Sequence, residues 1–220
     1  MTIHPKGTPM IEILFVRHGQ PVSGIRNPDL APAGIDDARR LATWLRGEQI
    51  DLVVASPYAR ALQTAQVVAA ALSRDVDLVL DDLREWDDDI TAEDYTAVED
   101  MAADDPRLLA VSSGRYEEYV PSLDLGGFRR RARSALEQLF ALRPSGRIVA
   151  VAHGGIINAA LADVLEMPKT FWHNPAYTSV ARVRRLDSGV VVVDSVNDTA
   201  HLRGVPDHRT ESAFDAEPAR

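Results

Sequence analysis

The chain has 220 residues, 45% of them hydrophobic, and its 33 acidic and 24 basic side chains give a net charge of −9. This length and apolar content suffice for one sizeable core, and the absence of cysteine excludes a disulfide framework and a thiolate metal site. No segment has the pattern of a signal peptide or the length of a membrane span, so we expect a soluble cytoplasmic protein.

Apolar strand patterns alternate with helical patterns along most of the chain. After a flexible lead-in at 1–10, we expect one domain over 11–202 and a tail over 203–220. The periodicity predicts helices over 33–46, 58–73, 127–142 and 155–165, and strands over 11–16, 52–54, 76–80, 147–151, 179–186 and 190–193. This order predicts an α/β fold, a three-layer αβα sandwich with a mostly parallel central sheet. The turn Asp187-Ser188-Gly189 indicates an antiparallel hairpin that adds an antiparallel edge strand.

The stretch from about 85 to 126 fits no strand–helix unit, and we expect it to form a small cap insertion. It is acidic, since residues 81–105 hold twelve Asp or Glu against the single Arg84. A solvated acidic face accounts for this composition; a second interpretation is that the cap repels large polyanions, which disfavours nucleic acid. The arginines that follow are expected to pair with this cap rather than to bind substrate; they are Arg129, Arg130, Arg131 and Arg133.

Three predicted strands end in residues that suit a phosphate group. The first strand runs into Arg17-His18-Gly19, and the fourth breaks at His153-Gly154-Gly155. After the second strand, Ser56-Pro57 is placed to start a helix with Arg60 in its first turn. Arginine binds two phosphate oxygens at once, neutral imidazole attacks phosphorus, and glycines at a helix amino terminus bring backbone N–H groups close to an anion. Because the carboxyl ends of parallel strands meet at one sheet edge, these groups are expected to share a pocket.

In these motifs the chain resembles the histidine phosphatase superfamily, also called the phosphoglycerate mutase-like family. The matching residues are Arg17-His18-Gly19, Ser56-Pro57 with Arg60-Ala61 and Gln63-Thr64-Ala65, Leu83-Arg84-Glu85-Trp86, His153-Gly154-Gly155 and the closing segment Asn197-Asp198-Thr199-Ala200-His201-Leu202. The resemblance implies a phosphohistidine intermediate on His18 and an acid/base role for Glu85, without metal or cofactor. The phosphate would be held by Arg17, Arg60, His153 and Gly154.

The surroundings of Glu85 differ from the common family pattern. Relatives often follow this glutamate with an aromatic residue and a glycine, whereas this chain continues Trp86-Asp87-Asp88-Asp89. Asp87 or Asp88 is therefore an alternative acid/base. Trp86 is expected to pack rather than to bind substrate.

Two departures from phosphoglycerate mutases favour the phosphatase branch. The loop at 21–30 is short and offers few polar contacts, of which Ser23 and Asn27 are the candidate substrate-binding residues. The Gly-Glu-Ser motif of the mutases is replaced by Asp124-Leu125-Gly126-Gly127.

We therefore expect a metal-independent phosphomonoester hydrolase that acts on a small phosphorylated metabolite. A phosphoglycerate mutase is one alternative, and a phospho-ligand-binding regulatory module with an impaired site is another. The expected partner is the small substrate, without nucleic acid or membrane. The identity of the substrate and the existence of a homodimer stay open.

Overall fold

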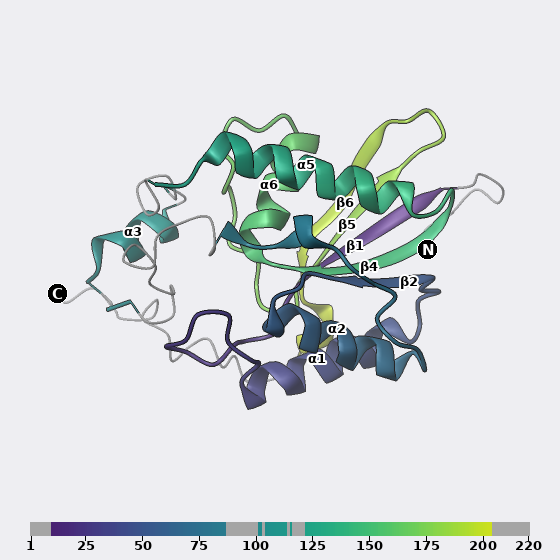
Figure 1. The fold of residues 1–220 in the computed structure, drawn as a ribbon, viewed down its shortest axis with the longest axis horizontal. Coiled ribbons are helices and arrows are strands. Elements are labelled where there is room, and N and C mark those ends of the chain that lie inside the picture. Colours follow the sequence, from purple (N-terminus) through teal and green to yellow (C-terminus); the bar gives the residue numbers. More distant parts are fainter. Residues whose placement is uncertain (1–9, 87–100, 103, 114, 116–121, 204–220) are drawn as a thin grey trace.

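A computed structural model describes residues 10–86, 101–102, 104–113, 115 and 122–203. This part of the chain forms a six-stranded sheet with helices on both faces (Figure 1). The strand order is β3-β2-β4-β1-β5-β6, and neighbours are parallel from β3 to β1 and antiparallel from β1 to β6. The α/β prediction and the antiparallel hairpin at the sheet edge are thereby confirmed. Residues 1–9 of the predicted lead-in, residues 204–220 of the predicted tail and much of the predicted cap lie outside the described residues.

The helices and strands follow the predicted order with shifted ends, apart from an additional helix at 106–112 that lies inside the predicted cap. The strands are β1 Ile11–Arg17, β2 Leu52–Ala55, β3 Leu78–Val79, β4 Gly146–Ala152, β5 Val180–Arg185 and β6 Val191–Asp198. The helices are α1 Pro32–Leu45, α2 Ala59–Ala71, α3 Pro106–Ser112, α5 Leu125–Ala141 and α6 Gly154–Val164, and the 3-10 turns are η1 Asp81–Leu83 and η4 Ala200–Leu202. Over the described ranges, no helix is long and apolar enough to cross a membrane.

Side chains that hydrogen-bond to the backbone explain two of the shifted ends. β3 begins after the predicted 76 because the Asp77 carboxylate, rather than a backbone carbonyl, accepts from the Val53 N–H at 2.7 Å. α5 begins two residues before the predicted 127 because Asp124 caps it, accepting from the Gly127 N–H at 2.9 Å.

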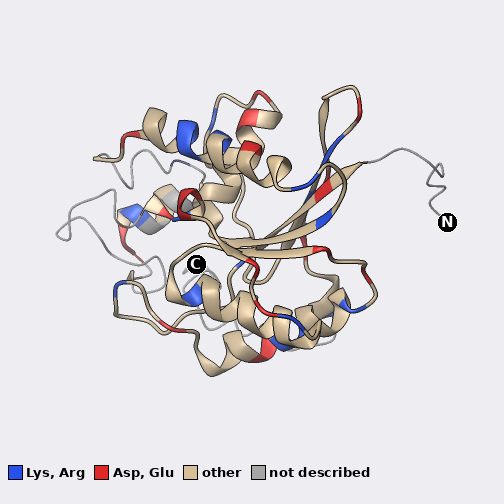
Figure 2. Cartoon of the chain, turned by 45° about the vertical axis from the view of Figure 1, so that its right-hand side comes forward, with Lys and Arg blue, Asp and Glu red and all other residues tan. Residues whose placement is uncertain are grey.

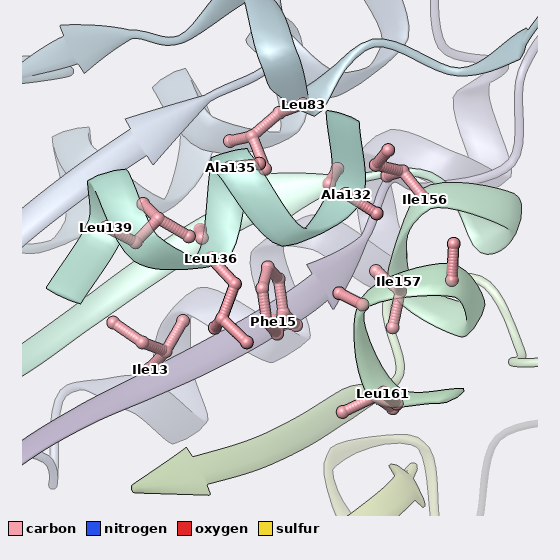
Figure 3. Close-up of a cluster of buried hydrophobic side chains, with 14 of the residues drawn as sticks. Ile13, Phe15, Leu83, Ala132, Ala135, Leu136, Leu139, Ile156, Ile157 and Leu161 are labelled. Carbon is pink, nitrogen blue, oxygen red and sulfur yellow. The ribbon is translucent and has the colours of Figure 1, made fainter. Parts of the chain in front are cut away.

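The central strand β1 is buried on both faces, because its side chains alternate between the two helical layers. Ile13 and Phe15 pack against α5 and α6 (Figure 3). Leu14 and Val16 pack against α1 and α2. β1 is therefore fixed in the middle of the sheet, and its last residues are held in place from both sides.

A ring of four charged side chains lies on the α1–α2 side of the sheet. Arg182 of β5 lies 2.8 Å from Glu48 and 3.4 Å from Glu12, and Arg147 of β4 pairs with the same two glutamates. Figure 2 shows acidic and basic segments next to one another on these strands. The ring thus joins three neighbouring strands, β4, β1 and β5.

Candidate active site

The two predicted histidines follow neighbouring parallel strands. β1 and β4 pair in register, with Arg17 opposite Ala152. The His18 N–H continues this ladder by donating to the Ala152 carbonyl at 3.0 Å. Both imidazoles are buried, and their ring centroids lie 5.0 Å apart. The strand register therefore brings two histidines together at the carboxyl edge of the sheet.

His18 has one ring nitrogen with a fixed role. Its Nδ1 lies 2.7 Å from the Gly19 carbonyl oxygen, which can only accept, so Nδ1 carries the proton. Burial, followed by the charges of Arg60 and Arg17, holds the pKa of His18 well below its usual value of 6.5. The ring is therefore neutral, and Nε2 carries a lone pair, towards which Arg60 Nε donates at 3.2 Å. A neutral imidazole with an unprotonated Nε2 is the form that attacks phosphorus, once an ester takes the place of the Arg60 contact at that nitrogen.

In His153 the ring nitrogen that bonds to a neutral group of the protein is Nε2, whereas in His18 it is Nδ1. Its Nε2 lies 2.8 Å from the hydroxyl oxygen of the fully buried Ser56, which also accepts weakly from the Tyr58 N–H at 3.4 Å. We infer that the hydroxyl proton points to Nε2, which places the ring proton on Nδ1. Within the described residues this buried Nδ1 has no hydrogen-bond partner. It is suited to donate to an anion beside His18.

Guanidinium groups give the histidine pair a positive environment. Arg17 Nη1 donates to the Pro175 carbonyl at 2.7 Å, and its guanidinium carbon lies 4.1 Å from the centre of the Tyr177 ring. Burial comes first in lowering the pKa of His153, followed by the charge of Arg60; His18, Arg17 and Arg131 contribute further. The site thus combines neutral imidazoles with fixed cations, which suits a phosphate dianion.

Glu85 lies against the start of α6, next to His153. It is 8% exposed, and its Oε2 accepts from the Gly155 N–H at 2.7 Å. Its Oε1 accepts from the Trp86 N–H at 3.2 Å. Trp86 itself packs into the hydrophobic core. A carboxyl group is therefore positioned by backbone donors beside the second histidine.

The close approach of Glu85 to α6 requires a glycine at 155. A Cβ built on Gly155 would fall well inside van der Waals contact with Glu85 Oε1 and 2.9 Å from the Trp86 ring. We expect Gly155→Ala to lower turnover at least about tenfold, because Glu85 must move. Gly47→Ala is the matched control, since a Cβ there meets only the Trp44 carbonyl, at 3.7 Å. Equal turnover of p-nitrophenyl phosphate by the two variants in a steady-state assay would contradict this role of Gly155.

The structure shows no contact between the two candidate substrate-binding residues, Ser23 and Asn27, and the two histidines, within the described part of the chain. Ser23 is exposed. The Oδ1 of Asn27 accepts, at 2.9 Å, from the N–H of Ala59, which is the first residue of α2. Asn27 therefore accepts from the N–H at the start of α2, a role that the sequence suggested for Ser56. The Ser56 hydroxyl instead bonds to Nε2 of His153. Their substrate-binding role stays a prediction. The reserve candidates Asp87 and Asp88 lie outside the described residues.

The expectation that the four α5 arginines pair with the acidic cap is wrong for two of them. Arg130 lies 3.8 Å from Asp124, an acidic residue of the predicted cap range. Arg133 pairs with Asp163 of α6, and Arg129 donates to the Met167 carbonyl at 3.1 Å. The reason is geometric, because α6 packs against α5 and its end supplies these nearer acceptors.

Arg131 is a residue of the site that the sequence did not indicate. It donates to the backbone carbonyls of Arg84 and Glu85, and its charge helps to lower the pKa of His153. Thr64 is another, since its hydroxyl accepts from the Gly19 N–H at 3.0 Å and thereby holds the turn after His18. Thr64 was part of the matching motif, but no local signal indicated its contact.

The neutral histidines predict how stability depends on pH. The pKa of His18 is lowered in the folded protein, so His18 takes up a proton near its ordinary pKa of 6.5 only in the unfolded chain. The free energy of unfolding therefore falls as the pH drops below that value. We expect His18→Asn to lose about 1 kcal/mol less stability than the wild type between pH 7.5 and 5.5. Urea unfolding at both pH values measures this, and equal losses would contradict a neutral buried His18.

Residues 13–199 match the family model described as the histidine phosphatase superfamily, branch 1. The chain is similar to phosphoglycerate mutase-like protein 4 of Arabidopsis thaliana, with 31% identity over 202 residues that cover 87% of this chain and 86% of the relative. It is also similar to adenosylcobalamin/alpha-ribazole phosphatase of Salmonella typhimurium, with 28% identity over 179 residues and 74% and 84% coverage. A solved phosphoserine phosphatase of Entamoeba histolytica, in complex with 3-phosphoglyceric acid, matches with a TM-score of 0.67 and 25% identity over 87% of this chain and 99% of that one.

Proposed function

Because this chain belongs to branch 1 of the histidine phosphatase superfamily, we propose that it hydrolyses a small phosphate monoester through a phosphohistidine on His18. The observation that carries the proposal is the His18 ring. Its Nδ1–H is bound to the Gly19 carbonyl, which leaves the Nε2 lone pair at a site with two guanidinium groups and a second histidine. The same carbonyl stabilises the positive charge that develops on the ring during attack.

In the first step, the Nε2 lone pair forms a bond to phosphorus and the bond from phosphorus to the ester oxygen breaks. The leaving oxygen takes a proton from the Glu85 carboxyl group. Arg17, Arg60 and the Nδ1–H of His153 hold the phosphoryl oxygens, whose charge persists in the transition state. Fixed cations of this kind supply electrostatic stabilisation without a metal ion.

In the second step, the Glu85 carboxylate takes a proton from water, and the water oxygen forms a bond to phosphorus. The bond from phosphorus to Nε2 breaks, so inorganic phosphate leaves and His18 recovers its lone pair. Glu85 is protonated again, and each group has returned to its starting state. One carboxyl group serves both steps, as general acid and then as general base.

Phosphoglycerate mutase-type transfer is the second candidate, supported by the name of the Arabidopsis relative. It shares the first step and differs in the acceptor, which is a hydroxyl of the bound organic acid rather than water. Three observations favour hydrolysis: the short 21–30 loop, the engagement of Asn27 with α2, and the similarity to two phosphatases.

The decisive experiment uses p-nitrophenyl phosphate and 3-phosphoglycerate as substrates, each with and without EDTA. We expect release of inorganic phosphate from p-nitrophenyl phosphate at a rate that the chelator leaves unchanged. Conversion of 3-phosphoglycerate to its isomer without phosphate release would instead establish the mutase. Binding of phosphate without turnover of any ester would indicate the regulatory module, and loss of activity with EDTA would contradict the metal-free mechanism.

A further inference from the structure

The closing segment at 197–202 contacts the loop at 175–178, called here the Tyr177 loop, whose Tyr177 ring lies against Arg17 and His18. Asn197 Oδ1 accepts from the Ala176 N–H at 2.7 Å, and His201 Nε2 lies 2.9 Å from the Thr178 hydroxyl oxygen. The segment is anchored on its other side, because η4 packs against α1 and the His201 ring lies 5.9 Å from the Trp44 ring. The mechanism above uses none of these residues.

A single peptide unit connects Asn197 to Arg17. The carbonyl of Pro175 accepts from Arg17 Nη1 at 2.7 Å, while the N–H of the same unit, on Ala176, donates to Asn197 at 2.7 Å. The N–H and the C=O of a planar trans peptide point in opposite directions, so this unit is a rigid link between the two side chains. Each hydrogen bond polarises the unit and strengthens the other.

The backbone of the closing segment suits this contact. Asn197 has a φ of +53°, a conformation that asparagine, aspartate and glycine adopt more readily than other residues. Asparagine is therefore a residue type that both accepts the backbone angle and presents an oxygen to Ala176.

A second contact runs from His201 to the backbone of His18. Thr178 is fully buried and has a φ of +57°, which is strained for a β-branched side chain. Its N–H donates to the His18 carbonyl at 3.3 Å, and its hydroxyl bonds to His201. Strain of this kind persists only where the surroundings hold it in place.

We propose that Asn197 is a positioning residue that fixes the Arg17 guanidinium through the Pro175–Ala176 peptide, with His201 holding the His18 backbone through Thr178. The inference rests on the proposed function, since it assigns Arg17 and His18 to the phosphoryl group. In this role, Asn197 and His201 act through Ala176 and Thr178 rather than on the substrate. The closing segment therefore acts on the site indirectly, through the backbone and side chains of the Tyr177 loop.

The test compares Asn197→Gly, which keeps the backbone angle and removes the acceptor, with Asn197→Asp, which keeps both. The readout is the dissociation constant for orthovanadate, measured by calorimetry on folded protein. We expect Asn197→Gly to weaken binding about tenfold, because one of a few charge-assisted donors loses its orientation. Asn197→Asp should bind within about twofold of the wild type. Wild-type affinity in Asn197→Gly, or equal weakening in both variants, would overturn the proposal.

A second pair of variants, at His201, tests the proposal independently in case an Asn197 variant fails to fold. His201→Leu removes the bond to Thr178, and His201→Gln retains a side-chain amide that can bond to the hydroxyl; only the leucine variant should weaken vanadate binding. Thermal unfolding of each variant separates lost stability from lost affinity. Because vanadate binding needs no turnover, a wild type that binds vanadate yet hydrolyses no ester contradicts the proposed function and leaves this test decisive.

Discussion

His18→Ala is expected to reduce turnover at least about a thousandfold, whereas Arg60→Ala should reduce it about a hundredfold and leave measurable activity. The difference follows from their roles. Without His18 no nitrogen can accept the phosphoryl group, while Arg60 is one of several groups that stabilise charge. Arg60 also donates to His18 Nε2 at 3.2 Å, so its loss leaves the nucleophile in place but less well oriented.

Steady-state assays with p-nitrophenyl phosphate measure the rates of both variants. A quench under neutral or basic conditions, after brief mixing with radiolabelled substrate, should trap phosphate on the wild type and on Arg60→Ala but not on His18→Ala. Label retained by His18→Ala, or near-normal turnover in it, would exclude His18 as the nucleophile.

Glu85→Gln is expected to slow hydrolysis of an alkyl phosphate about a hundredfold or more, and that of p-nitrophenyl phosphate much less. A leaving group of low pKa departs without a proton, so the first step for p-nitrophenyl phosphate hardly needs the acid. The ratio of the two rates therefore reports proton donation itself. Parallel steady-state assays of both substrates measure it.

The same substitution has a structural cost that must be measured separately. Both carboxylate oxygens of Glu85 accept a backbone N–H, from Gly155 and from Trp86. A glutamine amide has one acceptor oxygen, so one of these N–H groups loses its partner at a cost of about 1–3 kcal/mol. Urea unfolding measures that loss. Equal slowing of both substrates would mean that Glu85 only organises this part of the chain, and would move the acid/base role to Asp87 or Asp88, or to no residue at all.

The central features of the fold and of the histidine pair could be read from local patterns. Apolar runs of strand length predicted β1 and β4, and each ended at a His-Gly break. Carboxyl ends of parallel strands share an edge, so two such breaks predicted adjacent histidines. The 5.0 Å between the rings agrees with that expectation. The catalytic roles of these residues stay predictions.

Contacts that depend on strand order could not be read in this way. Arg17 meets the Pro175 carbonyl across 158 residues of sequence, and no local pattern carries that pairing. Ser56 resembled a helix cap because serine before proline has that local preference. Asn27 instead reached the start of α2 from a distant loop, which released Ser56 for His153. Tertiary contacts overrode local preference at these positions.

The position of β1 in the sheet has a consequence for synthesis of the chain. β1 is made first, yet its two neighbours, β4 and β5, lie at 146–152 and 180–185. During translation both edges of this apolar strand therefore stay unpaired until β4 has left the ribosome, and its second edge stays unpaired until β5 has followed, a period in which an exposed strand is prone to aggregate. A nascent chain that ends just before β5 already contains both histidines but lacks the strand that follows the Tyr177 loop, so the proposed phosphatase activity should appear late, with completion of the sheet.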